Sequence, residues 1–307
     1  MILNESTSVK HFVAIDLGSN SFHLIIVREQ NNHTEVIYKQ KQSIRLAASL
    51  EREGTINDQS MTLAMNCLKR FADSFAQLPN CQVMIVATYA LRQAQNSQQF
   101  LEQAITVMPH PINIISGERE AELIFLGVAY TQIINQPTLI IDIGGGSTEF
   151  IIGQALSPNL TRSLDIGCVS FSQRFFHSGK ISEELMFAAE LYSKQVLGSI
   201  SLEYNSFGWE QTLGSSGSIK AITRIMKELY DDSNITLKRL YRIKSQLINW
   251  GHHDNIAFAN LSDKRRPLLA PAIAILIPCF ELLNIDMLKY NSGGVREGLL
   301  HQLRFTQ

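Results

Sequence analysis

The sequence predicts an α/β protein in which one unit of strands and helices is built twice. The first observation is a repeated pattern, in which an apolar run ends in an aspartate and continues through a polar loop into a second apolar run. It reads "AIDLGSNSFHLIIV" at residues 14–27 and "IIDIGGGSTEFII" at residues 140–152. The second observation is that a third strand follows each pair, and then helices that alternate with parallel strands. The third is the length, since 307 residues are enough for two compact domains.

In the first half, apolar runs at residues 13–16 and 22–27 indicate two strands around the first loop, with a third strand near residues 35–40. The next segment is expected to be helical, because apolar residues recur at a 3.6-residue period over residues 61–78. Asn57 or Asp58 could cap this helix, and Pro79 closes it. The rest of this half is expected to contain strands at residues 83–88 and 112–116, a helix around residues 100–108 and a helix from about Glu118.

The second half repeats the order of the first. The expected strands lie at residues 138–142, 149–153 and 161–167, near Gln211, and at residues 287–292; the expected helices include residues 183–202, one from about Ser218 and one after Gly294. No low-complexity linker separates the halves, and the switch falls between residues 127 and 137. We therefore predict a first domain over residues 1–126 and a second over residues 127–307.

The composition excludes several classes of protein. A formal net charge of −1 gives no bulk basicity for nucleic acid, and four cysteines without a CxxC pair are typical of a reduced, cytoplasmic protein. The first twelve residues contain no apolar run of the kind that a signal peptide needs. Residues 267–280 carry no charge but are too short to span a membrane and contain two internal prolines, so we expect a buried core helix there.

The two loops are expected to bind phosphate. Glycine lets a ligand approach the backbone and permits positive φ, and successive amides in such a turn form an anion site. The expected phosphate-binding residues are Gly18, Ser19, Asn20 and Ser21 in the first loop, and Gly144, Gly145, Gly146, Ser147 and Thr148 in the second. Either loop alone would read as a hairpin turn, but two of them, each after an aspartate, favour a duplicated site that clamps a polyphosphate. Asp16 and Asp142 could hold a cation, or its water shell, beside the phosphates.

This pair of loops resembles the phosphate motifs of the actin, Hsp70 and sugar-kinase superfamily. Together with "TYALRQA", "IISGEREAELIFLGV", "GCVSF", "GSSGSIKA" and "GGVREGLL", in this order over almost the whole chain, it resembles the Ppx/GppA family of exopolyphosphatases and guanosine pentaphosphatases. The resemblance implies two ribonuclease-H-like domains of the actin-like ATPase type with a central cleft. Longer relatives continue into an HD-type helical domain, so this chain is expected to be a short two-domain member or a piece of a longer protein.

The resemblance implies an activity as well. It implies an enzyme that releases the terminal phosphate of inorganic polyphosphate, converts pppGpp to ppGpp, or does both, with Mg²⁺ or Mn²⁺, in the stringent response. The expected partners are polyphosphate and guanosine penta- or tetraphosphate, without nucleic acid or integral membrane contact. The sequence leaves open the preferred substrate, the polymer length and a homodimer. It also leaves open two rivals, a non-catalytic sensor of the same ligands and an actin-fold ATPase or kinase.

The acids of "SGEREAE" begin a helix, where they complement its dipole, and periodicity does not single out one of them. The resemblance implies that Glu120 is the catalytic base, which positions and deprotonates the attacking water. It also implies a catalytic, metal or water-positioning role for Glu149, and Asp142 is expected to bind Mg²⁺ through water. Arg92 follows a buried strand, where α/β sheets bind ligands, and the family implies a phosphate contact.

Three other features carry weaker expectations. Gly214, Ser215, Ser216 and Gly217 resemble the nucleoside-side loop of the superfamily. Two basic clusters are the candidates for guiding a long polyanion, and they consist of Lys39, Lys41 and Arg45, and of Lys264, Arg265 and Arg266. His252 and His253 have no further ligand at metal spacing, so we expect a polar loop there.

Overall fold

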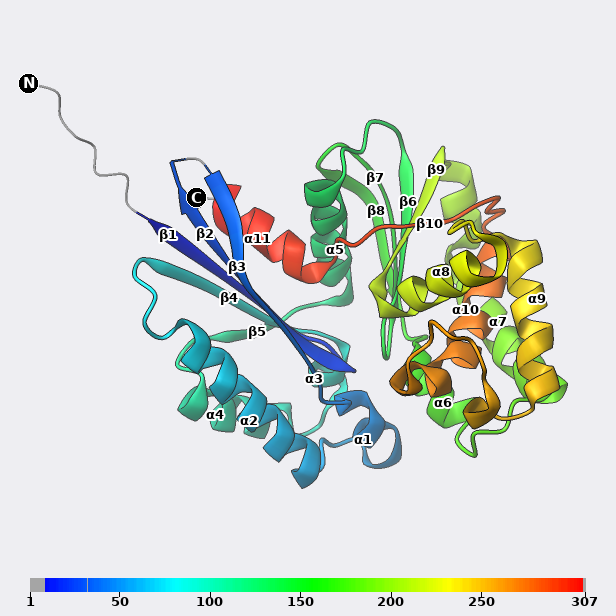
Figure 1. Cartoon of the computed structure of the whole chain (residues 1–307), viewed down its shortest axis with the longest axis horizontal. Coiled ribbons are helices and arrows are strands. Elements are labelled where there is room, and N and C mark those ends of the chain that lie inside the picture. The colour runs from blue at the N-terminus through cyan, green and yellow to red at the C-terminus, as the bar shows by residue number, and fades with distance from the viewer. Residues whose placement is uncertain (1–8, 32, 306–307) are drawn as a thin grey trace, which may run out of the picture. The chain divides into compact units, whose positions relative to one another are not determined.

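The computed structural model describes residues 9–31 and 33–305, without the side chains of residues 49 and 51–53. The expectation about a signal peptide rests largely on residues 1–8, which lie outside the described residues. The chain forms two compact units (Figure 1). Unit 1 comprises Met1–Ile115 and Val295–Gln307, and unit 2 comprises Ser116–Gly294.

Unit 1 is built on a five-stranded sheet in the order β3-β2-β1-β4-β5. Its elements are β1 (Lys10–Leu17), β2 (Ser21–Gln30), β3 (His33–Ser43), α1 (Leu46–Glu53), α2 (Asp58–Phe75), β4 (Cys81–Ala87), α3 (Tyr89–Gln93), α4 (Ser97–Val107), β5 (Ile112–Ile114) and α11 (Val295–Phe305). The first three strands pair antiparallel, whereas β4 and β5 run parallel to β1. Asn57 caps α2 by accepting a hydrogen bond from the Ser60 amide at 2.9 Å, one of the two predicted caps.

Unit 2 has the same topology, with the strand order β10-β9-β6-β7-β8. Its elements are α5 (Gly117–Thr131), β6 (Thr138–Ile143), β7 (Thr148–Gln154), β8 (Ser157–Leu164), α6 (Cys168–Phe175), α7 (Glu183–Phe207), β9 (Gln211–Ser215), α8 (Ser216–Tyr230), α9 (Leu237–Trp250), two 3₁₀ turns η1 (His253–Asn255) and η2 (Asp263–Arg265), α10 (Arg266–Leu282) and β10 (Lys289–Tyr290). Three antiparallel strands again precede two parallel ones. The predicted duplication of an α/β unit is therefore confirmed.

The uncharged segment at residues 267–280 forms most of α10, which packs against α6, α7, α8 and α9. Its side chains from Leu269 to Phe280 are buried, as expected for a core helix that is apolar all round. Within the described residues, no helix is both long enough and apolar enough to cross a bilayer.

The compact units differ from the predicted domains at two helices. Helix α5 follows β5 of the first sheet but packs on β7 and β8, so unit 2 begins at Ser116 and not at residue 127. Helix α11 follows β10 of the second sheet but packs on β1, β2 and β4 of unit 1. The two halves thus exchange their last helices. The apolar pattern of a helix shows that it is buried, but it does not say against which of two similar sheets.

Two strands also differ from their predicted bounds. The third strand of unit 2 ends at Leu164, before the expected residue 167, because the backbone of residues 166–168 turns to contact the glycine-rich loop. Strand β10 has only two residues, where six were expected.

Candidate active site

The glycine-rich loop of unit 2 is the tight turn between β6 and β7. Its ends meet where the Gly144 amide donates to the Ser147 carbonyl at 2.9 Å, and Asp142 lies opposite Glu149 in the strand register. A Cβ added to Gly144 would lie 2.9 Å from that carbonyl oxygen, and one added to Gly18 would lie 3.1 Å from the Ser21 oxygen. Among the described glycines, those with positive φ lie elsewhere, so close approach of the backbone, and not the expected positive φ, requires glycine here.

The start of α6, the helix that follows β8, forms backbone hydrogen bonds to the second loop. The amides of Cys168, Val169 and Ser170 donate to the carbonyls of Gly144 and Gly145, at 2.8 to 3.2 Å. A Cβ added to Gly167 would lie 2.5 Å from the carbonyl carbon of Gly146, so the start of α6 packs directly on the loop. The loop therefore has a fixed shape before any ligand binds.

Unit 1 fixes its own loop in the same way. The carbonyls of Ser19 and Asn20 accept hydrogen bonds from the amides of Ile44, Arg45 and Ala47, at 3.0 to 3.1 Å, where α1 begins. In both loops the carbonyls thus accept hydrogen bonds from the segment that follows the third strand, at or just before the start of a helix.

The amides of these loops are left available. Among the described residues, the amides of Gly145, Gly146 and Ser147 donate no hydrogen bond, and the same holds for Ser19 and Asn20. Adjacent, unused amides in a fixed turn are the donors that an anion binds. This arrangement is compatible with the phosphate-binding residues predicted in each loop.

Three carboxylates lie near enough to one another beside the loop of unit 2 for their charges to interact. Asp142 is the second-last residue of β6, Glu149 is the second residue of β7, and Glu120 comes from the first turn of α5. Glu149 is 1% exposed and Glu120 is 8% exposed. Burial raises the pKa of Glu149 well above its ordinary value, and the charges of Glu120 and then Asp142 raise it further. Burial also raises the pKa of Asp142 to about 6.

The three acids of the α5 segment differ in their surroundings. Glu118 is exposed to solvent, and Glu122 forms an ion pair with Arg119 at 2.6 Å. Glu120 alone of the three is buried, and its charge reaches Glu149. Geometry therefore distinguishes the acid that periodicity could not.

Serine hydroxyls orient the two strand carboxylates. Ser163 of β8 lies opposite Glu149 in the register and donates to its Oε1 atom at 2.8 Å, while Ser147 also hydrogen-bonds to Glu149. The Ser215 hydroxyl donates to Asp142 Oδ2. Ser215 was assigned to the nucleoside-side loop, so the structure gives it an additional contact in the carboxylate cluster. Its neighbour Ser216 has a φ of 86°, a strained conformation at the start of α8.

Arg265 is a member of the site that the sequence did not distinguish. Its guanidinium covers Gly217, where an added Cβ would lie 2.7 Å from Cζ. Burial raises the pKa of Cys168 at the start of α6, and the charge of Arg265 offsets part of this rise. Lys264 is exposed, and Arg266 pairs with Asp263 at 3.3 Å. The three side chains thus differ in exposure and in partners, and their expected role in guiding a long polyanion stays a prediction.

In unit 1, Arg92 lies in α3, directly after β4, and donates to the Ile115 carbonyl at 3.0 Å. This hydrogen bond keeps the half-buried guanidinium at the carboxyl ends of β4 and β5. Of the other basic cluster, Lys39 and Lys41 are exposed on the edge strand β3, and Arg45 is exposed before α1.

The sequence suggested no further metal ligand beside His252 and His253, but the structure places Asp254 next to them. Ligand atoms of His252, His253 and Asp254 lie within 4.8 Å of one another. However, the Asp254 amide donates to Nδ1 of His252 at 3.2 Å, and Nε2 of the same ring lies 3.2 Å from the Ser178 carbonyl. Both ring nitrogens of His252 thus already have polar partners in the protein.

Two α/β units of identical topology, each with a glycine-rich turn after its first strand, define an actin-like fold. Solved structures agree. A crystal structure of an exopolyphosphatase from Cytophaga hutchinsonii matches with a TM-score of 0.85 and 25% identity, over 96% of this chain and 97% of the other. The Ppx/GppA family member from Aquifex aeolicus matches with a TM-score of 0.80 and 21% identity, over 98% and 100%, and shows the same fold.

The sequence comparisons identify the family. The model of the Ppx/GppA phosphatase family matches residues 25–305, so the chain belongs to this family. A candidate exopolyphosphatase of Haemophilus influenzae is 39% identical over 96% of this chain and 92% of its own length. A guanosine-5'-triphosphate,3'-diphosphate pyrophosphatase of Pseudoalteromonas atlantica is 39% identical over 94% of this chain, but the match spans only 58% of that longer protein.

Proposed function

We propose that this chain hydrolyses the terminal phosphoanhydride bond of inorganic polyphosphate, of pppGpp, or of both, releasing phosphate. The observation that carries the proposal is the meeting of Glu120, Asp142 and Glu149 beside a rigid loop with unused amides. Relatives named as exopolyphosphatase and as pppGpp pyrophosphatase support both substrates without ranking them.

The carboxylates fit a hard cation. Among the described residues, Asp142 and Glu149 form no ion pair with a basic side chain, and serine hydroxyls are the partners that we find for them. Crowded carboxylates with raised pKa values favour a divalent cation bound through oxygen, and we propose Mg²⁺ or Mn²⁺ at Asp142 and Glu149. When bound, such a cation would offset the negative charge of adjacent phosphates.

The residues of the chain supply the remaining chemistry. The amides of Gly145, Gly146 and Ser147, with the Arg265 guanidinium, would hold the phosphate oxygens and stabilise charge as it moves to the leaving oxygen. The Glu120 carboxylate would orient the attacking water and accept its proton. In unit 1, the first loop and Arg92 are proposed to bind phosphate in the same way. Binding of one substrate by both loops stays a prediction of the sequence repeat.

One assay tests the proposal against both rivals. Phosphate release is measured from polyphosphate, pppGpp and ATP, with Mg²⁺ and with excess chelator. We expect turnover of polyphosphate, pppGpp or both, little turnover of ATP, and loss of activity in chelator that Mg²⁺ restores. Binding without turnover would support a sensor, and preferential ATP turnover would support an ATPase or kinase.

The proposal includes a cytoplasmic location, which rests on the absence of disulfides among the described cysteines. A homodimer stays a prediction, and sedimentation of the purified chain would test it.

A further inference from the structure

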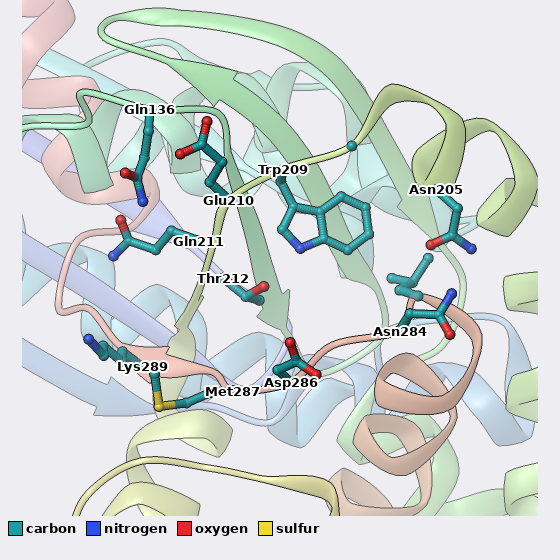
Figure 2. Close-up of a pocket in the computed structure, with 12 residues that line it drawn as sticks. Gln136, Asn205, Trp209, Glu210, Gln211, Thr212, Asn284, Asp286, Met287 and Lys289 are labelled. Carbon is teal, nitrogen blue, oxygen red and sulfur yellow. The ribbon is translucent and has the colours of Figure 1, made fainter.

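Unit 2 contains a polar pocket at the amino ends of its parallel strands, whereas the glycine-rich loop lies at their carboxyl ends. The pocket has a volume of about 710 Å³ and is shown in Figure 2. Gln136 precedes β6, Gln211 begins β9 and Lys289 begins β10, so the amino ends of three strands border it. The catalytic loop and Ser215 lie at the carboxyl ends of the same strands. The pocket is therefore separate from the carboxylate cluster.

The lining combines one aromatic ring with charged and amide side chains. In Figure 2 the Trp209 indole lies in the middle of the pocket, between Glu210 on one side and Asn284 on the other, with Asp286 below. The lining thus contains two carboxylates, those of Glu210 and Asp286, and one ammonium group, that of Lys289. Among the residues that the structure describes, Glu210, Asp286 and Lys289 form no ion pair, so their charges are not neutralised within the chain.

Two helix ends add to the negative potential. Helix α7 ends at Phe207 and α10 ends at Leu282, and their following residues, Gly208 and Leu283, line the pocket. The last carbonyls of a helix carry partial negative charge, and neither helix has a basic residue in its last turn. Asn205 donates to the Leu282 carbonyl at 2.8 Å and so satisfies one of these groups.

These features select the charge of a ligand. A phosphate would meet two carboxylates and two helix C-termini, so the pocket disfavours anions. A cation would gain from the carboxylates and from the face of the Trp209 ring, which attracts ammonium and guanidinium groups. The Gln136 and Gln211 amide oxygens could accept hydrogen bonds from its N–H groups.

We propose that this pocket binds a small organic cation, an alkylammonium or guanidinium compound, between the Trp209 indole and the Glu210 and Asp286 carboxylates. The pocket is large enough for a ligand with an aliphatic chain as well as a charged group. This site is independent of the proposed phosphatase activity.

Fluorescence tests the proposal directly, because the chain has two tryptophans and Trp250→Phe leaves Trp209 as the sole indole reporter. The variant is titrated with spermidine and with agmatine at constant ionic strength, and with MgCl₂ and guanosine as inorganic and uncharged probes. We expect a saturable change with one site per chain for at least one of the amines. No saturable change with either amine, or an equal response to MgCl₂ or guanosine, would overturn the proposal.

Charge variants test whether the negative charge of the pocket favours amine binding. In the same background, Glu210→Gln with Asp286→Asn should weaken amine binding by at least about tenfold, because the attraction of two carboxylates is lost. Lys289→Gln should strengthen amine binding, because the repulsion between its ammonium group and the cationic ligand is removed. The matched control is Glu183→Gln with Glu184→Gln, which removes the same charge from the exposed first turn of α7. Equal affinities in the pocket and control variants would contradict the proposal.

Calorimetry of Trp209→Leu completes the test without a fluorescent reporter. Loss of the ring should weaken amine binding by roughly 2- to 30-fold, the usual range of a cation–π contact. Unchanged affinity would contradict the placement of the ligand on the indole. Circular dichroism of every variant checks that it is folded, and phosphate release from polyphosphate should be unchanged in the Glu210 and Asp286 variant.

Discussion

At the scale of single residues, the carboxylate cluster depends on its hydroxyl partners. Ser163 holds Glu149 through one hydrogen bond to a carboxylate, a contact of roughly 1.5–3 kcal/mol. We therefore expect Ser163→Ala to lower kcat about tenfold with a smaller change in KM, because Glu149 would lose its orientation. Ser163→Thr keeps the hydroxyl and should restore most of the rate. Steady-state kinetics of both variants decides this, and equal rates in Ser163→Ala and the wild type would contradict it.

Arg265 gives a second prediction at this scale. Because its guanidinium covers Gly217 near the cluster, Arg265→Gln should reduce kcat/KM roughly 10- to 100-fold on polyphosphate and pppGpp alike. The neighbouring Lys264 is exposed, so Lys264→Gln is the matched control and should change little on pppGpp. A loss confined to long polyphosphate would instead favour the surface path that we first predicted from sequence.

The raised pKa of Asp142 predicts how stability depends on pH. An acid whose pKa rises on folding, here from 3.8 to about 6, binds its proton more tightly in the folded state. Its effect on stability therefore becomes unfavourable as the pH rises between these values. In chelator, the melting temperature of Asp142→Asn minus that of the wild type should be more positive at about pH 7.5 than at about pH 4.5. A difference that does not change with pH would contradict the raised pKa.

Sequence reasoning reached some of these residues and not others, for physical reasons. Asp142, Glu149 and the loop lie within one short segment, so a local pattern identifies them. Ser163 becomes a partner of Glu149 only through the β7–β8 register, and Arg265 meets Gly217 only through tertiary packing of residues far apart in the sequence. No local pattern in a single sequence contains that information.

At the scale of elements, each loop is held by the helix that follows the third strand of its sheet. Gly167, the N-cap of α6, packs on the loop of unit 2, and a side chain there would collide with backbone, which cannot move aside cheaply. Gly167→Ala should therefore lower both kcat and the melting temperature. Gly198→Ala is the control, because a Cβ at Gly198 in α7 meets nothing within 4 Å and alanine favours a helix. Equal behaviour of the two variants in both measurements would contradict this role of α6.

The strands and long helices could be predicted because their apolar patterns are strong. Helix α6 and the short helices α1 and α3 were not predicted, since they have eight residues or fewer and two of them begin by bonding to a loop. The hydrogen bonds from α1 and α6 to the loops are the part of the site's architecture that the loop motifs do not encode.

At the scale of the whole molecule, the halves exchange their last helices. Leu299 of α11 is fully buried in unit 1, although it follows the last strand of unit 2 in the chain. Leu299→Ala should cost about 2–5 kcal/mol of stability, as is usual for a buried leucine. Hydrogen exchange should then show loss of protection in β1 and β2 before β6 and β7. Leu202→Ala, at a position 80% exposed, is the control. Earlier loss in β6 would contradict the assignment of α11 to unit 1.

The central claim is that Glu120, as part of the carboxylate cluster, accepts the proton of the water that hydrolyses a phosphoanhydride bond. Phosphate release from polyphosphate and pppGpp by Glu120→Gln, beside Glu118→Gln as the exposed neighbour, tests it most directly. Glutamine keeps the size of the side chain but cannot accept the proton from water. We expect kcat to fall about 10²–10⁴-fold in Glu120→Gln, with KM largely kept, and to stay near the wild-type value in Glu118→Gln. Full activity in Glu120→Gln, or an equal loss in both variants, would contradict the claim.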